Sequence, residues 1–209
     1  MKALRFIPVF LASLFSFDQK QQHVALATLI QQDQFEEVRR LLEHGRSANE
    51  SGSQGITPLM EASRGGKRDF AKLLLKHGAN LHTRNKFGSS AILFASCARN
   101  HELVSLLLAR GSKINSPNVF GTTPLMCAAE SGDVSTVRLL LRKTKRVDHK
   151  DRSGNTALFY AAREGRAETV KILLRHGANP RVKNSRGLKA SDVARRNLYP
   201  RVATLINPR

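Results

Sequence analysis

Apolar residues are spaced along most of this chain at intervals that place them on one face of an α-helix, and the predicted helices come in pairs. In the pair predicted between residues 52 and 84, the first helix begins at Thr57-Pro58 and ends at Gly65-Gly66. Threonine is a favourable helix cap, and proline is a favourable first helical residue. The second helix closes at His77-Gly78, where glycine can adopt the left-handed conformation common at helix ends.

The same pattern of turn, helix, break and helix recurs at a constant interval. The glycines that mark the turn lie 33 residues apart, at Gly55, Gly88, Gly121, Gly154 and Gly187. A fixed period between 20 and 50 residues is typical of stacked-repeat proteins, in which each helix pair is buried against its neighbours. We therefore expect an all-α solenoid of stacked helix-turn-helix units with short β-turn or hairpin tips.

The period divides residues 22–209 into six units. A capping unit that lacks the leading turn is expected at residues 22–51, and a second capping unit at residues 184–209. The four full repeats between them are 52–84, 85–117, 118–150 and 151–183.

Three residues depart from the repeated pattern. In the first unit, Asp33 is expected to cap the second helix. Arg99 replaces the glycine between two helices, and Thr144 replaces the closing glycine. A residue other than glycine in a left-handed cap costs on the order of 1 kcal/mol, so we expect the helix before Thr144 to end differently from the others.

These motifs resemble those of the ankyrin-repeat family over residues 22–209. The family pattern Thr-Pro-Leu-His-x-Ala is matched by residues 57–62 and 123–128 in all but the histidine, and the Gly-Ala-Asn ending is matched at residues 78–80 and 177–179. The family's amide or acidic turn residue is present as Asn85, Asn118, Asp151 and Asn184. The motif histidine is replaced by Met60, Leu93, Met126, Phe159 and Asp192, which suggests a more apolar linkage between units.

The resemblance implies a non-enzymatic scaffold that grips a partner protein on its concave face, through the turn tips and the exposed side of each first helix. Carried onto this sequence, the partner-binding residues are Arg64, Arg84, Lys86, Phe87, Val119, Phe120, Glu130, Lys150, Arg152 and Arg163. Phe87 and Phe120 occupy equivalent positions in consecutive repeats, so they are expected to lie side by side and exposed. The alternatives are that the two rings fold back against their turns, and that the basic residues serve only solubility.

The charge narrows the class of partner. The net charge is +19, and the part from Arg138 onward holds 19 Lys/Arg against 5 Asp/Glu. We expect an acidic, partly apolar protein partner and a monomeric chain. The alternative is low-specificity binding of a polyanion, such as nucleic acid, glycan or an anionic lipid surface, by the basic C-terminal half. Because basic and aromatic residues do not alternate as they do in proteins that stack bases, nucleic acid is the weaker choice.

No pattern of catalytic, cofactor-binding or metal-binding residues is present. The chain lacks a phosphate-binding Gly-x-x-x-x-Gly-Lys loop, a His-Glu-x-x-His zinc motif and a Gly-x-Ser-x-Gly elbow. Cys97 near His101 has no third group to orient a nucleophile. Cys97 and Cys127 could form a disulfide, or Cys127 could be a small packed apolar residue.

Residues 1–17 have the features of a signal peptide. A basic start at Lys2 and Arg5 precedes a short apolar core, and no acidic residue occurs before Asp18. This predicts a secreted or periplasmic bacterial protein. A capping helix or a tail is the alternative, and it would place the protein in the cytoplasm. The chain contains no run of 18 apolar residues, so no transmembrane segment is expected.

Overall fold

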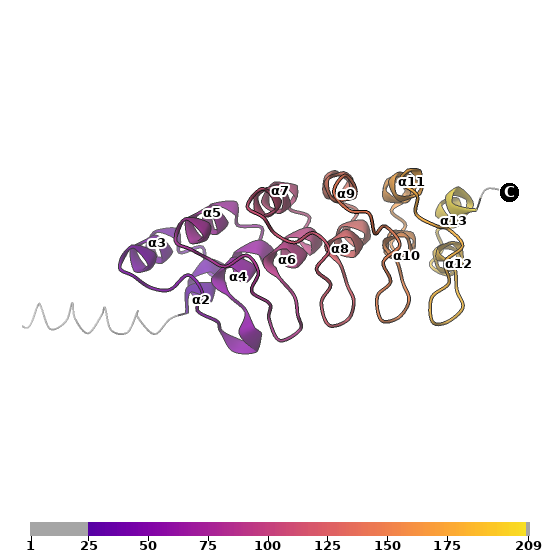
Figure 1. The fold of residues 1–209 in the computed structure, drawn as a ribbon. Coiled ribbons are helices and arrows are strands. Elements are labelled where there is room, and N and C mark those ends of the chain that lie inside the picture. The colour runs from indigo at the N-terminus through magenta and orange to yellow at the C-terminus, as the bar shows by residue number, and fades with distance from the viewer. Residues whose placement is uncertain (1–24, 208–209) are drawn as a thin grey trace, which may run out of the picture.

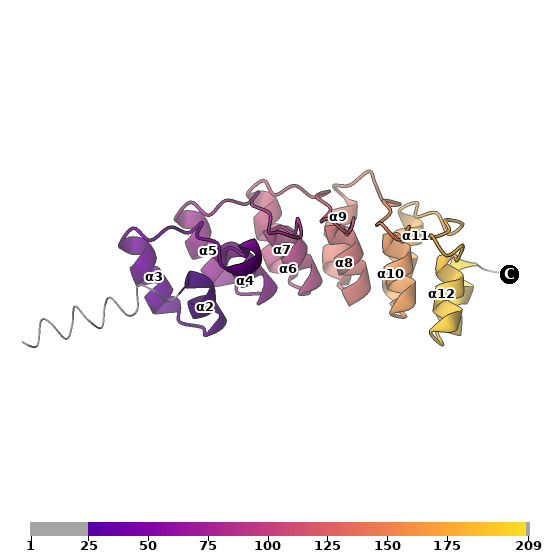
Figure 2. The same ribbon diagram turned by 90° about the horizontal axis from the view of Figure 1, so that it is seen from below.

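In the computed structural model, which describes residues 25–207, the helices lie in two rows (Figure 1). The first helices of the units are α2 (Leu26–Gln31), α4 (Pro58–Arg64), α6 (Ala91–Cys97), α8 (Pro124–Ser131), α10 (Ala157–Arg163) and α12 (Ala190–Arg196). The second helices are α3 (Phe35–Glu43), α5 (Arg68–Lys76), α7 (His101–Ala109), α9 (Val134–Leu141), α11 (Ala167–Arg175) and α13 (Pro200–Ile206). Seen from below, the units follow one another in chain order from the N-terminal to the C-terminal end (Figure 2). The expected all-α solenoid is confirmed.

The loops that precede the first helices project away from the row of second helices (Figure 1). The first loop contains a short 3₁₀ helix, η1 (Ser53–Gly55). Among residues 25–207 the only β-type pairing is an isolated bridge between Lys183 and Lys189, so the tips are turns and not paired strands. The predicted signal peptide at residues 1–17 lies outside the described residues.

The first helices begin as their sequence predicts. The hydroxyl of Thr57 accepts a hydrogen bond from the Met60 amide at 3.3 Å, and Thr123 caps α8 through the Met126 amide at the same distance. In both helices proline takes the first position, where a backbone amide would have no acceptor within the helix, so the missing amide hydrogen costs no hydrogen bond.

The break between the paired helices uses the left-handed region whether or not glycine is present. Arg99 occupies it with φ 57°, at the position where Gly66 has φ 66°. The prediction that Asp33 caps the second helix is wrong, because Asp33 also takes this conformation, with φ 59°, and residue 34 precedes the helix. The Asp33 carboxylate instead pairs with Lys67 Nζ at 2.7 Å.

The predicted irregular ending before Thr144 is confirmed. Helix α9 ends at Leu141, and Thr144 is absent from the residues with positive φ. Its amide donates to the Leu140 carbonyl at 3.0 Å, and its hydroxyl donates to Asn115 Oδ1 of the preceding unit at 2.8 Å. The side chain that replaces glycine therefore links two units.

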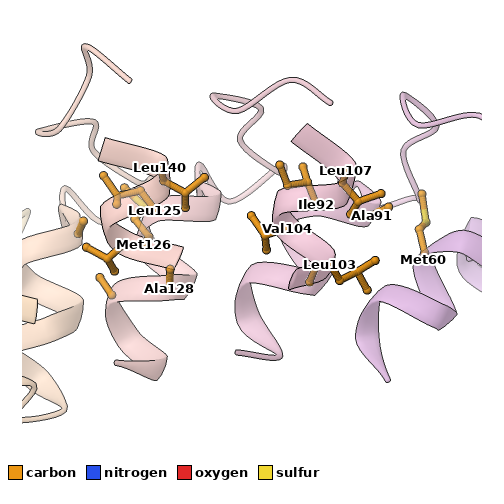
Figure 3. Packing of buried hydrophobic residues seen from close by; sticks show 14 of the residues in the cluster. Met60, Ala91, Ile92, Leu103, Val104, Leu107, Leu125, Met126, Ala128 and Leu140 are labelled. Carbon is orange, nitrogen blue, oxygen red and sulfur yellow. The ribbon is translucent and has the colours of Figure 1, made fainter. Parts of the chain in front are cut away.

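One continuous apolar core runs along the stack. Figure 3 shows part of it, where apolar side chains of neighbouring helices pack together. Three of the residues that stand in place of the motif histidine belong to this core, namely Met60, Met126 and Phe159. Met60 and Met126 are each 1% exposed. The linkage between units is therefore largely apolar, as expected from the sequence. Each unit buries its apolar surface against its neighbours, which is how a repeat array gains stability.

Polar side chains add a second link between units by reaching back to the end of the preceding first helix. Lys67 Nζ donates to the Ile30 carbonyl at 2.6 Å, Asn100 Nδ2 to that of Gly66 at 2.9 Å, and Arg166 Nε to that of Glu130 at 3.1 Å. Carbonyls at or just beyond a helix end lack the regular partner four residues on, so these bonds give them acceptor contacts in the next unit.

Candidate partner-binding face

The loops and the exposed sides of the first helices form one surface, which we call the inner face. In the four loops from residue 85 onward, the amide or carboxylate three residues before the glycine holds the loop. Asn118 Oδ1 accepts hydrogen bonds from the amides of Phe120 at 3.0 Å and Thr122 at 2.9 Å. Asp151 Oδ1 does the same for Ser153 and Asn155, both at 2.8 Å. Side chains of this type favour turns because they replace backbone partners, so these loops have one shared conformation.

Neighbouring loop tips are joined by single backbone hydrogen bonds, each 2.9 Å long. They run from Lys86 N to Gln54 O, Val119 N to Phe87 O, Arg152 N to Phe120 O, and Ser185 N to Ser153 O. The residues before each glycine are therefore held in register from one end of the stack to the other.

This register places the two predicted phenylalanines against each other. The ring centroids of Phe87 and Phe120 lie 6.4 Å apart with an interplanar angle of 22°, and the residues are 45% and 53% exposed. Val119, which precedes Phe120 in the same loop, is also exposed. The predicted pair of exposed neighbouring aromatics is confirmed, and the alternative that the rings fold back to pack their turns is wrong.

Two of the predicted basic residues bridge the loops. Arg84 Nη2 donates to the Pro117 carbonyl at 2.6 Å, and Lys150 Nζ donates to the Lys183 carbonyl at 3.4 Å, so both connect equivalent positions of consecutive loops. Lys86 and Arg152 are exposed at the tips, and neither forms a salt bridge within residues 25–207. The Arg84 and Lys150 side chains are therefore held in place by carbonyl acceptors of the next loop, whereas within residues 25–207 no hydrogen bond or salt bridge holds those of Lys86 and Arg152.

The predicted charged residues of the first helices, Arg64, Glu130 and Arg163, are paired within the protein. Arg64 contacts Glu61 at 2.9 Å. Arg163 forms salt bridges with Glu130 and with Glu164. The sequence did not predict these pairs, because they depend on the rotamers that long side chains adopt across and along the helices. At these positions the inner face is close to neutral.

Cys97 and Cys127 form a disulfide that joins α6 to α8 on the inner face, with their Cα atoms 4.6 Å apart. Cys97 is exposed and Cys127 is buried, so the reading of Cys127 as only a packed apolar residue is wrong. Their separation of 30 residues is three short of the repeat, and three residues are about one helical turn. The signal for this disulfide is therefore the spacing itself, because both cysteines face the same side of adjacent helices.

A pocket of ≈ 440 Å³ lies on the inner face between the last two units. Its walls come from the loops and from α10 and α12, and its lining includes Tyr160, Arg163, Arg186 and Arg196. The Tyr160 hydroxyl donates to Asp151 Oδ2 at 2.7 Å, and the Arg163 guanidinium lies 5.0 Å from the centre of the tyrosine ring. Burial, with the hydrogen bond to Asp151, raises the pKa of Tyr160 to about 12.

The predicted site residues do not include Arg186 and Arg196, which lie in the unit expected to cap the stack. Their register was nevertheless a signal. Arg186 is equivalent to Phe87 and Phe120, and Arg196 is equivalent to Arg163.

Within the described part of the chain, no three His, Cys, Asp or Glu side chains are grouped so as to hold a metal ion. The same residues include no helix that is long and apolar enough to cross a membrane.

Comparison with known families agrees with the fold. No curated protein matches the chain. The family model described as ankyrin repeats (3 copies) matches residues 6–85 and 92–184, which together make up most of the sequence. With its period of 33, its capped helix pairs and this match, the chain belongs to the ankyrin-repeat family.

Proposed function

We propose that this protein is a non-enzymatic scaffold whose inner face binds an acidic, partly apolar surface of another protein. Ankyrin repeats generally mediate protein–protein interaction. The observation that carries the proposal is the exposed, stacked pair Phe87 and Phe120. Val119 continues this surface, and Lys86 and Arg152 flank it. Aromatic anchors ringed by polar groups are the usual centre of binding energy at interfaces.

The size of the aromatic contribution follows from the area that the rings leave in water. Each phenylalanine is about half exposed, and a full aromatic side chain buries about 150–250 Å². Covering both rings would therefore remove about 200 Å² of apolar surface, worth about 5 kcal/mol at 25 cal/mol per Å². The loss of motional freedom on association reduces this gain, but the pair is large enough to act as the anchor.

The test uses Phe87→Ala/Phe120→Ala as bait in a quantitative pull-down from the source organism. Leu198→Ala is the matched control, because Leu198 is an apolar residue 85% exposed in the turn between α12 and α13. The double variant should lose the proteins that the wild type and the control retain. Equal recovery of every partner by all three baits would show that Phe87 and Phe120 do not anchor a partner, and would contradict the proposed binding face.

The acidic character of the partner rests on charge complementarity. Lys86 and Arg152, at the tips of their loops, are exposed and lack salt bridges within the described residues, so an acidic surface would be attracted to them. The effect should appear mainly in the association rate and its salt dependence. A captured partner whose association rate is unchanged between low and high salt would argue against this part of the proposal.

Binding of a polyanion is the second candidate, and one observation favours it. Lys145, Arg146 and Lys150 line a hollow of ≈ 510 Å³ together with His149 and His176. The only acidic residue in that lining, Asp148, accepts hydrogen bonds from the Asn179 amide. Binding to heparin or nucleic acid should then fall steeply with salt and should be weakened by Lys145→Gln/Arg146→Gln. Salt-insensitive retention would exclude this candidate.

We also propose that the protein works in the periplasm or outside a bacterial cell. The Cys97–Cys127 disulfide supports this location, because disulfides persist mainly in oxidising compartments. The leader-like composition of residues 1–17 points the same way. N-terminal sequencing of the protein purified from its natural source should find these residues removed. An intact Met1 would instead favour the cytoplasm.

A further inference from the structure

We infer that the pocket between the last two units is a subsite for an acidic side chain of the protein segment that binds the inner face. The inference rests on the proposed function, because the segment is the one anchored on Phe87 and Phe120. It specifies where on the inner face a second contact with this segment lies, and that a carboxylate of the segment makes it.

The pocket has two arginines whose charge is not balanced within the protein. Arg186 is exposed at the tip of the last loop, and Arg196 is exposed at the end of α12. Neither forms a salt bridge within residues 25–207, whereas Arg195, next to Arg196, pairs with Asp192 at 3.3 Å. Two unpaired guanidinium groups that line one cavity are suited to a carboxylate, which they can bind through charge-assisted hydrogen bonds.

The one carboxylate that lines the pocket does not supply the missing partner. Asp151 Oδ1 accepts two loop amides, and Oδ2 accepts the Tyr160 hydroxyl at 2.7 Å and Asn155 Nδ2 at 3.2 Å. With four donors around it, this carboxylate is committed to the loop and to the tyrosine. The third arginine of the lining, Arg163, is already paired with Glu130 and Glu164, so the guanidinium groups without a salt-bridge partner in this lining are those of Arg186 and Arg196.

The position of the pocket relative to the aromatic pair sets a spacing for the ligand. Phe120 belongs to the unit 118–150, and the pocket lies between the next unit and the last one. Packed helices are about 8–10 Å apart, so one to two units correspond to about 10–20 Å. An extended segment advances about 3.3 Å per residue, so about three to six residues would separate the apolar anchor from the acidic residue.

The uneven distribution of these contacts also fixes the direction in which the segment lies. The apolar contact is in the middle of the stack, and the cationic pocket is at its C-terminal end. Toward the N-terminal end, the described arginine that is equivalent to Arg196, Arg64, is paired with Glu61 and so differs from the two unpaired arginines of the pocket. A ligand with one acidic end would therefore bind in a single orientation.

The test is selection of random dodecapeptides displayed on phage against the full-length protein. Wild-type protein should select peptides with an Asp or Glu at a constant spacing from an apolar residue. Arg186→Gln/Arg196→Gln should select peptides that keep the apolar residue and lose the acidic one. Phe87→Ala/Phe120→Ala should select the reverse.

The matched control is Arg175→Gln/Arg201→Gln, which removes the same charge from exposed residues that do not line the pocket. A selected peptide should bind this control as it binds wild type, and should bind the Arg186/Arg196 variant about tenfold more weakly by fluorescence anisotropy. Equal weakening by both double variants would overturn the subsite in favour of a general charge effect. An acidic consensus retained by Arg186→Gln/Arg196→Gln would also overturn it, while leaving the proposed function intact. No consensus with wild-type protein would overturn both.

Discussion

Replacing Gly121 with alanine tests whether the loops are locked to one another as the structure indicates. Gly121 has φ +81°, and a Cβ atom added to it would lie 2.8 Å from Asp151 Cα and 3.0 Å from Arg152 N in the next loop. Gly187 has a similar φ of +71° but is in the last unit, and no heavy atom lies within 4 Å of the same added Cβ. Both glycines therefore require a positive φ, but only Gly121 is packed against a neighbouring loop.

The expected costs follow from this difference. At Gly187, alanine should cost only the penalty of a left-handed non-glycine residue, about 1–2 kcal/mol. At Gly121, the next loop must also move away, which breaks the 2.9 Å bond from Arg152 N to Phe120 O, worth about 0.5–1.5 kcal/mol. Lost contacts between the loops add to this, so Gly121→Ala should cost about 2–4 kcal/mol in total. Gly55→Ala, whose nearest contact would be 3.4 Å, should resemble Gly187→Ala.

The measurement is urea unfolding of the three variants and the wild type, followed by circular dichroism under one set of conditions. Because repeat arrays can unfold in more than one step, the comparison rests on the order of the variants and not on absolute free energies. Equal destabilisation of Gly121→Ala and Gly187→Ala would refute the reasoning, since it would show that the neighbouring loop imposes no constraint.

Two further changes test the inner face. The Cys97–Cys127 disulfide spans 30 residues, so its reduction should lower the free energy of unfolding of the wild type by about 3–4 kcal/mol, because the unfolded chain regains entropy. In urea unfolding, Cys97→Ser/Cys127→Ser should not respond to a reductant. A wild type whose stability does not change on reduction would contradict this prediction. The raised pKa of Tyr160 favours the protonated phenol in the folded state, so its contribution to stability should be complete below about pH 10 and lost as the pH rises toward 12. The chain has two tyrosines and no tryptophan, so near-ultraviolet titration should show a step near pH 12 that Tyr160→Phe removes, and a step that persists in this variant would rule out the assignment.

The period of 33 was enough to predict most of the fold and part of the candidate site, because a residue's place in the repeat determines its burial. Phe87 and Phe120 could be paired from the sequence since Asn85 and Asn118 impose the same turn on both loops. The misassignment of Asp33 has a physical origin, as its favourable capping propensity was outweighed by the left-handed turn that the stack requires there.

What the period could not determine was the pairing of long side chains. Whether Arg163 is free or bound to Glu130 depends on rotamers across two helices, and whether Arg84 reaches Pro117 depends on its rotamer between two loops. The cationic pocket was missed for this reason. Its identity depends on which arginines remain unpaired, and the number of arginines in the sequence does not reveal that.

The disulfide and the aromatic pair lie on the same two units, 85–117 and 118–150, in the middle of the array. Linear repeat arrays fray from their ends, because a terminal unit is supported by only one neighbour. A covalent bond between the two central units keeps them adjacent even when the outer units open. The apolar site should thus be the last part of the surface to come apart, while the cationic pocket, between the two units nearest the C-terminus, would be among the first.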